Sequence, residues 1–212
     1  MFINMSPLQC YADAPRIPAI LYAVFQMMFA VMVPVIVTGA WAEKLNFRAF
    51  ILFAFIWPHM VYYPVSHWVW GGGWLSNIRD GEGVIDYAGG LTVHTTSGIA
   101  ALVVARIMNR RENEDKLMDH AHNIPLTLIG GMFIWAGWFG FNGGSSFGAN
   151  SIASLAIVNT HIAASIAAFV WGMIAFLKKE QYHLTEFVNG AMCGMAAVTP
   201  GAGYMLVRPS LL

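Results

Sequence analysis

Charge is scarce in this sequence. Only 10% of its 212 residues are Asp, Glu, Lys or Arg, whereas a soluble domain carries about 25% charged residues. Because 58% of the residues are hydrophobic, a chain folded in water would leave most of its exterior apolar. The composition therefore excludes an ordinary water-soluble domain and predicts a protein that lies within a lipid bilayer.

Net charge and paired cysteines are lacking as well. The 11 basic and 11 acidic side chains cancel, which excludes nucleic acid as a partner, because phosphate binding needs a net basic face. The two cysteines, Cys10 and Cys193, stand far apart and show neither Cys-x-x-Cys nor Cys/His ligand spacing. We therefore expect two free thiols, no disulfide framework, no metal site and no cofactor.

Long charge-free runs are what the sequence does contain. About 20 helical residues cross a hydrocarbon core of about 30 Å, so such runs predict membrane spans. Turn residues separate them, notably Gly71–Gly73 and Asn142–Asn150. The sequence predicts an all-α, polytopic membrane helical bundle with about six spans: Ile17–Trp41, Arg48 to near Trp70, Asp86–Arg106, two within His120–Leu177, and about Phe187–Tyr204.

The loops between the spans predict one membrane domain over residues 17–204 and its orientation. Residues 1–16 lack the basic start and apolar run of a secretory signal, so we expect an extracellular loop or tail there. Residues 205–212 form an atypical C-terminal end. Most Lys and Arg side chains fall in three alternate loops, which the positive-inside rule assigns to the cytoplasm, with the N-terminus of this segment outside the cell membrane. These residues are Lys44, Arg48, Arg106, Arg110, Arg111, Lys116, Lys178 and Lys179.

Polar side chains in the third span are the first candidates for function, because ionisable groups within a membrane usually mark a path or a relay. His94 follows Asp86 by eight residues, which in a continuous helix places it roughly 12 Å below the outer boundary. Its imidazole could pass a proton or bond to a neighbouring helix, and the sequence leaves both open. Asp86 could cap the helix start, which we favour, or attract cations at the outer mouth.

Other polar and small residues of the predicted spans allow further functional or packing interpretations. A ring at Trp70, near Asp86, could hold a small cation by its π face. His59 and His67 on the second span raise a haem hypothesis, but eight residues on one helix point to different faces. We expect His161 to make interhelical hydrogen bonds, together with Asn159 and Thr160 beside it. Two glycine pairs at GxxxG spacing predict close helix packing: Gly140/Gly144 and Gly190/Gly194.

Five segments in order resemble the ammonium transporter, methylammonium permease and Rhesus family. They lie on the predicted spans from about Ile17 to Tyr204, which correspond to the third to the eighth of the family's usual eleven spans. The segments are Phe25–Ala30, Trp70–Gly73, Asp86–His94, Gly137–Ser145 and Val198–Tyr204.

The resemblance implies a channel or transporter for ammonium or ammonia, not an enzyme, with methylammonium as an analogue. It implies an outer vestibule in which aromatic rings and a hydroxyl recruit ammonium, with an aspartate that shapes the vestibule. Two phenyl rings gate the pore below, and a histidine lines an apolar lumen through which neutral ammonia passes. The resemblance assigns these roles by motif position. The residues that recruit ammonium would be Phe25, Phe29, Trp70, Asp86 and Ser145, the gate rings would be Phe29 and Phe141, and His94 would line the lumen.

The resemblance also implies a homotrimer and sets out what the chain lacks. The family's second lumen histidine lies on a late span and has no counterpart among His120, His122, His161 and His183. We therefore expect a fragment of the fold, with about six of eleven spans. An ammonium sensor that reports nitrogen status to a signalling partner remains the alternative, and a cytoplasmic regulatory protein is a possible partner in either case.

Overall fold

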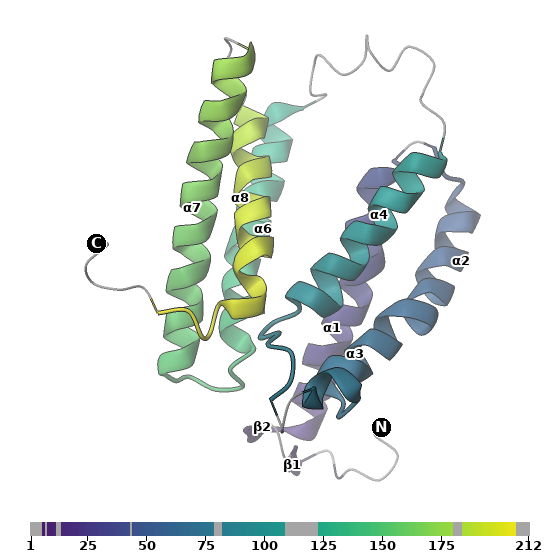
Figure 1. Cartoon of the computed structure of the whole chain (residues 1–212), viewed down its shortest axis with the longest axis vertical. Coiled ribbons are helices and arrows are strands. Elements are labelled where there is room, and N and C mark those ends of the chain that lie inside the picture. The colour runs from purple at the N-terminus through teal and green to yellow at the C-terminus, as the bar shows by residue number, and fades with distance from the viewer. Residues whose placement is uncertain are drawn as a thin grey trace. The chain divides into compact units, whose positions relative to one another are not determined.

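The computed structural model describes residues 6, 8–11, 14–42, 44–78, 82–108, 123–179 and 184–206. The chain divides into two compact units, residues 1–112 and 113–212. Helices α1 to α4 belong to the first unit and α6 to α8 to the second (Figure 1). Predictions that concern Arg110, Arg111, Lys116, His120, His122 and His183 lie outside the described residues.

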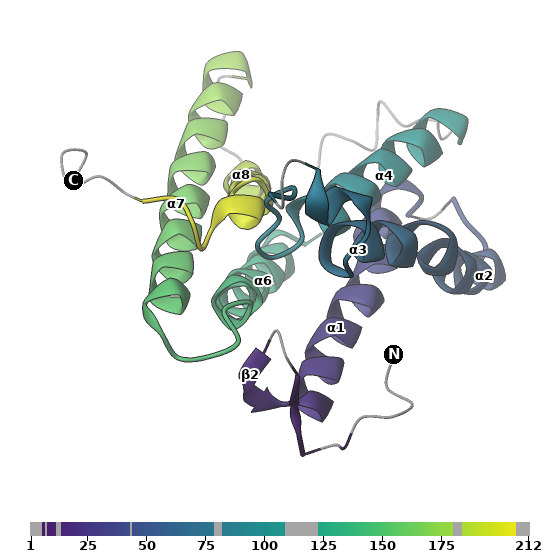
Figure 2. The ribbon, with the colours of Figure 1, turned by 60° about the horizontal axis from the view of Figure 1, so that its bottom comes forward.

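The first unit has a short antiparallel ribbon within the segment that we expected to be an extracellular loop or tail. Strand β1 (Cys10–Tyr11) pairs with β2 (Ala14–Pro18), and helix α1 (Ala19–Val37) follows directly. Figure 2 shows the ribbon at the first turn of α1. Residues before a proline avoid the helical region, and Ala14 and Ile17 both precede one. The helix therefore begins at Ala19, two residues later than the predicted start of the span.

The second membrane segment consists of two helices joined by a π-helical turn. Helix α2 (Phe47–Trp57) leads into the π turn Pro58–Tyr62, and α3 (Tyr63–Trp70) continues it. Pro64 has no N–H to donate to the carbonyl four residues back, so a regular α-helix cannot pass through it undisturbed. The segment ends at Gly71, as the triple glycine predicted.

The third segment starts later than the sequence predicted. Its helix begins with a π turn, Gly90–Thr95, and continues as α4 (Thr96–Ile107), whereas residues 83–89 are not helical. His94 is therefore only four residues into the helix, roughly 6 Å along its axis. The predicted depth of 12 Å is wrong because it assumed a helix from Asp86 onward.

The second unit is a bundle of three helices: α6 (Ile124–Gly144), α7 (Ser151–Lys179) and α8 (Leu184–Val198), with a 3₁₀ turn at Thr199–Gly201. Its buried core contains Ala164, Ala191 and Met195. A Cβ on Gly190 or Gly194 would come within 2.6 or 2.4 Å of a backbone carbonyl oxygen of α7, so the predicted close packing of this pair is confirmed. Gly140 has no atom within 4 Å of such a Cβ among the described residues, so close packing there stays a prediction.

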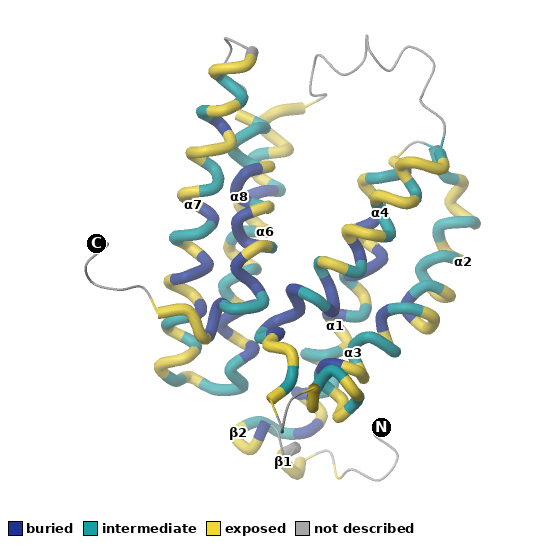
Figure 3. Tube along the Cα trace, in the orientation of Figure 1, coloured by how far each residue is buried: buried dark blue, intermediate teal, exposed yellow. Residues whose placement is uncertain are grey.

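Five helical segments of the described chain are long and apolar enough to cross a membrane: Ala19–Ala40, Phe47–Asn77, Gly90–Ile107, Ile124–Gly144 and Ser151–Lys178. Helix α8, the sixth expected span, has only 15 residues before its 3₁₀ turn. Figure 3 shows exposed residues along every helix, and large apolar side chains such as Phe133 and Leu102 are 76% and 69% exposed. Such surfaces need lipid or other protein around them.

Candidate functional site

Three aromatic side chains predicted to recruit a cation form one cluster in the first unit. Phe25 and Phe29 lie one turn apart on α1 with their ring centroids 5.0 Å apart, edge to face. Trp70, at the end of α3, meets Phe29 edge to face at 6.0 Å. Phe29 is only 3% exposed, so α1 and α3 hold the cluster in a packed arrangement.

The indole of Trp70 is also fixed by a hydrogen bond. Its Nε1–H donates to the backbone carbonyl oxygen of Asp86 at 2.7 Å. A buried indole N–H usually finds such a partner, and this one lies in the segment that leads into the third span. The bond therefore joins the aromatic cluster to the start of the helix that carries His94.

The carboxylate of Asp86 accepts four backbone N–H groups and is 7% exposed. Oδ1 accepts from Gly89 and Gly90 at 2.9 and 2.6 Å. Oδ2 accepts from Leu91 and Thr92 at 3.0 and 2.9 Å. The first N–H groups of a helix have no partner within it and carry partial positive charge. The favoured capping interpretation is thus confirmed, although Asp86 stands three residues before the N-cap position, Gly89.

Gly89 makes this cap possible. Its φ angle is +107°, in a region that side-chain-bearing residues rarely adopt. A Cβ there would also come within 2.7 Å of a methyl carbon of Val93. This glycine therefore lets the chain fold back over the carboxylate and then enter the helix.

His94 lies in the π turn that follows the cap. Its backbone N–H donates to the Gly89 carbonyl at 3.0 Å, and its side-chain Nε2 is buried. The π turn packs against α1 and α3, the helices that carry the aromatic cluster. The structure therefore places His94 in the same unit as Phe25, Phe29, Trp70 and Asp86.

The two remaining predicted residues lie at the end of α6 in the second unit. Ser145 follows the helix directly, and its hydroxyl donates to the Phe141 carbonyl at 2.9 Å. The Phe141 ring packs against Trp138 at 5.3 Å. Trp138 in turn donates from Nε1 to the hydroxyl of Thr199 at 3.1 Å, which joins α6 to the 3₁₀ turn after α8.

Comparison with known proteins decides the family. The model of the Ammonium Transporter Family matches residues 2–212. The chain belongs to this family. Ammonium transporter 1 of Dictyostelium discoideum is 43% identical over 205 residues, which cover 96% of this chain and 43% of that protein. Ammonium transporter Amt1 of Archaeoglobus fulgidus is 44% identical over 193 residues, which cover 91% of this chain and 48% of that protein.

Solved structures of the family resemble the fold. The crystal structure of Candida albicans Mep2 has a TM-score of 0.83 and 32% identity, covering 92% of this chain and 43% of that one. A structure described as a sensor Amt protein has a TM-score of 0.77 and 31% identity, covering 90% and 48%. The chain thus spans less than half the length of these relatives. The predicted incomplete ammonium-transporter-like fold is confirmed.

Some buried polar residues of this ammonium-transporter fold were missed as site candidates. Asn142, fully buried next to Phe141, donates from Nδ2 to the Thr160 hydroxyl at 2.8 Å. Asn159 donates to the carbonyls of Ala202 and Met205 at 2.8 and 2.7 Å. Thr160 thus takes part in an interhelical bond between α6 and α7, whereas Asn159 bonds to the segment that follows the 3₁₀ turn after α8. The signal in the sequence was an amide or hydroxyl within an apolar run.

His161 itself does not make the expected interhelical hydrogen bond within the described residues. It is exposed and lies beside the rings of Trp135 and Phe139, at 5.6 and 6.0 Å. His59, one of the two histidines behind the haem hypothesis, is also exposed, with Nδ1 2.6 Å from the Phe55 carbonyl oxygen of its own helix. No three His, Cys, Asp or Glu side chains of the described residues come together as a metal site.

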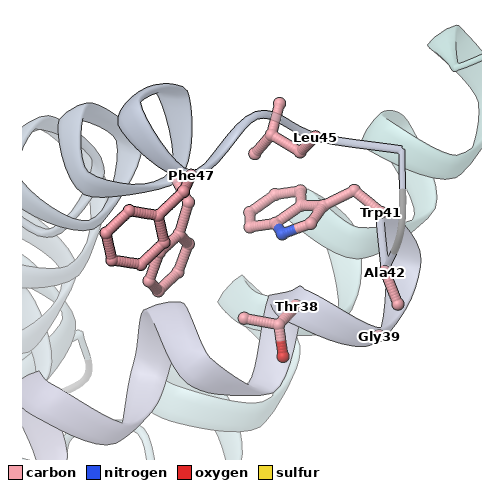
Figure 4. A pocket seen from close by; sticks show the side chains of 7 residues that line it. Thr38, Gly39, Trp41, Ala42, Leu45 and Phe47 are labelled. Atoms are coloured by element: carbon pink, nitrogen blue, oxygen red, sulfur yellow. The ribbon is translucent and has the colours of Figure 1, made fainter.

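A shallow pocket of about 290 Å³ lies where α1 gives way to α2. Figure 4 shows the Trp41 indole between Leu45, Phe47 and Thr38. Phe53 packs against the same indole at 4.6 Å. None of the residues predicted to recruit, gate or conduct lines this pocket, so it is separate from the aromatic cluster and from His94.

Proposed function

We propose that this chain forms part of a pore that recruits ammonium and conducts ammonia across a cell membrane. Membership of the ammonium transporter family supports the substrate. The observation that carries the residue roles is the cluster of Phe25, Phe29 and Trp70, tied to Asp86 by the indole hydrogen bond. The chain spans less than half of the length of its relatives. We therefore propose, as part of the same hypothesis, that the whole protein transports ammonium.

Recruitment in this proposal rests on the rings and not on a free carboxylate. A small cation gains about 0.5 to 2 kcal/mol from each favourably placed aromatic face. Both carboxylate oxygens of Asp86 are engaged with backbone N–H groups, so the side chain contributes its charge from a fixed position beneath the vestibule. Its backbone carbonyl separately fixes the position of Trp70. The family resemblance adds the hydroxyl of Ser145 to this recruiting set.

Conduction falls to the gate rings and to His94. Phe29 and Phe141 are each held by a second aromatic ring in their own unit, Trp70 and Trp138 respectively. A bare ammonium ion cannot enter an apolar lumen cheaply, whereas neutral ammonia can. His94 then passes the proton or bonds to the passing molecule, because an imidazole can both donate and accept.

The surroundings of the pore complete the proposal. The protein works as a transporter and not as an enzyme, in a homotrimer, with the N-terminus of this segment outside the cell. The basic side chains at Lys44, Arg48 and Lys178 would then face the cytoplasm, in agreement with the positive-inside rule.

The test replaces the matching stretch of the Dictyostelium transporter with this chain and follows radiolabelled methylammonium uptake and the charge moved in proteoliposomes. The chimera supplies the length that the chain does not cover. His94→Ala and His94→Asp are each expected to change uptake or charge movement by at least about tenfold, as loss of a proton-transferring group does. His161→Ala, at an exposed histidine of another span, is the matched control. Unchanged uptake and current in both His94 variants would overturn the relay.

A sensor function is the second candidate, since a structure described as a sensor Amt protein resembles this chain almost as well as Mep2 does. A sensor would bind ammonium at the same aromatic cluster without sustained flux. Binding of methylammonium to the chimera that Trp70→Ala abolishes, with no uptake in the unsubstituted chimera, would favour the sensor over the transporter.

A further inference from the structure

Two π turns interrupt the membrane helices of the first unit, and only one of them is explained by proline. The turn Pro58–Tyr62 starts at a proline, with Pro64 two residues beyond its end. The turn Gly90–Thr95, which contains His94, has no proline in it or beside it. π turns are rare and concentrate at functional sites, so something else in this segment must hold the second one.

The backbone around His94 contains hydrogen bonds between residues five apart, the spacing of a π-helix. The N–H of His94 donates to the carbonyl of Gly89, five residues back, at 3.0 Å. The N–H of Thr96 is shared between the carbonyl of Leu91, again five residues back, and that of Val93. The bonds to Gly89 and Leu91 lie at the start and the end of the π turn. Each spans five residues, one more than the four that a hydrogen bond of an α-helix spans.

Three hydroxyls follow one another at the end of this turn, and one of them matches its spacing. The Thr95 hydroxyl donates to the Gly90 carbonyl, five residues back, at 2.9 Å. The Thr96 and Ser97 hydroxyls donate four residues back, to the carbonyls of Thr92 and Val93, both at 2.6 Å. The four-residue pattern is the ordinary one for hydroxyls in any α-helix, so it does not select a π turn.

We propose that Thr95 is a positioning residue, which holds the π turn through its bond to the Gly90 carbonyl and thereby directs the side chain of His94. The proposal rests on the transport function proposed above, in which His94 lines the lumen. Thr95 itself touches neither ammonium nor the proton.

The reason is geometric. Each residue of an α-helix turns the chain by about 100°, so removing the extra residue of the π turn would rotate everything before it by about that angle relative to α4. The four backbone bonds to Asp86 hold Gly89 to Thr92 at the front end, and the packing of α4 against α1 holds the rear. His94 lies between these fixed ends, so loss of the π turn would change the direction of its side chain.

The closing experiment compares three variants of this chain. Thr95→Val keeps the shape of the side chain and removes the hydroxyl, and Thr95→Ser restores it. Thr96→Val removes the neighbouring hydroxyl with the four-residue bond and is the matched control. Magic-angle-spinning NMR of the ¹³C,¹⁵N-histidine-labelled chain in lipid bilayers, with the His94 signal assigned by its loss in His94→Gln, reports the local conformation without any need for transport.

We expect Thr95→Val to shift the Cα and ring signals of His94, and Thr95→Ser and Thr96→Val to leave them in place. In the chimera, Thr95→Val should lower methylammonium uptake about fivefold, as loss of one hydrogen bond of ordinary strength does, with recovery in Thr95→Ser. An unshifted His94 signal in Thr95→Val, or equal shifts in Thr95→Val and Thr96→Val, would overturn the proposal. A shifted signal with uptake that is insensitive to His94 would instead leave Thr95 as a positioning residue and refute the relay.

Discussion

At the scale of single residues, Asp86 shows how a carboxylate is accommodated at the edge of an apolar segment. Burying a charge is costly unless hydrogen bonds replace the lost water. Here the replacement comes from four consecutive backbone N–H groups, with the positive end of the helix behind them. The same residue, through its backbone carbonyl, fixes Trp70, so one residue organises the helix start with its side chain and the aromatic cluster with its backbone.

Asp86→Asn should therefore destabilise the first unit, because an amide offers one acceptor oxygen where the carboxylate offers two. We expect a loss of about 3 kcal/mol, the scale of charge-assisted hydrogen bonds that are lost within a buried site. The melting temperature of the detergent-purified chain measures it. Glu82→Gln removes the same charge four residues earlier at an exposed position and should leave the melting temperature unchanged; equal effects of the two changes would contradict this account.

At the scale of elements, the second unit is held by close approach of α7 and α8. Small residues on both helices make this possible, since Gly190 and Gly194 face the α7 backbone around Ala163 and Ala167. Helices in lipid gain little from hydrophobic burial against one another, so van der Waals contact of this kind is the main attraction.

Gly194→Ala is the corresponding prediction. Its Cβ would come within 2.4 Å of the Ala163 carbonyl oxygen, and overpacking of this kind costs about 1 to 3 kcal/mol. The melting temperature of the purified chain should fall by several degrees. Gly137→Ala on α6, where no described atom lies within 4 Å of the new Cβ, carries the same gain in helix propensity without the clash, and a similar fall there would refute the packing argument.

At the scale of the whole molecule, the distribution of Lys and Arg predicts which side each loop faces. The argument concerns the cost of translocating basic side chains and needs no knowledge of how the two units are arranged. Cys10 on β1 is exposed and lies before the first span, so its labelling tests the proposed outside position of the N-terminal segment.

In intact cells, a membrane-impermeant maleimide should label Cys10 in the Cys193→Ala background. Lys178→Cys, introduced at an exposed position near the end of α7 with Cys10→Ser and Cys193→Ala, should react only after the cells are permeabilised. The opposite pattern would reverse the orientation proposed for every span.

The sequence by itself determined five of the expected spans, the end of the second segment at Gly71 and the family, and it favoured the cap at Asp86. These features depend on local chemistry: the transfer of apolar side chains into lipid, the backbone freedom of glycine and the acceptors of a carboxylate. Only the tertiary structure decided the ribbon before α1, the late start of the third helix, the π turn around His94 and the contact of Phe25, Phe29 and Trp70. Each of these depends on which carbonyls and rings find partners several residues away or on another helix. The hydropathy of the sequence does not predict such partners.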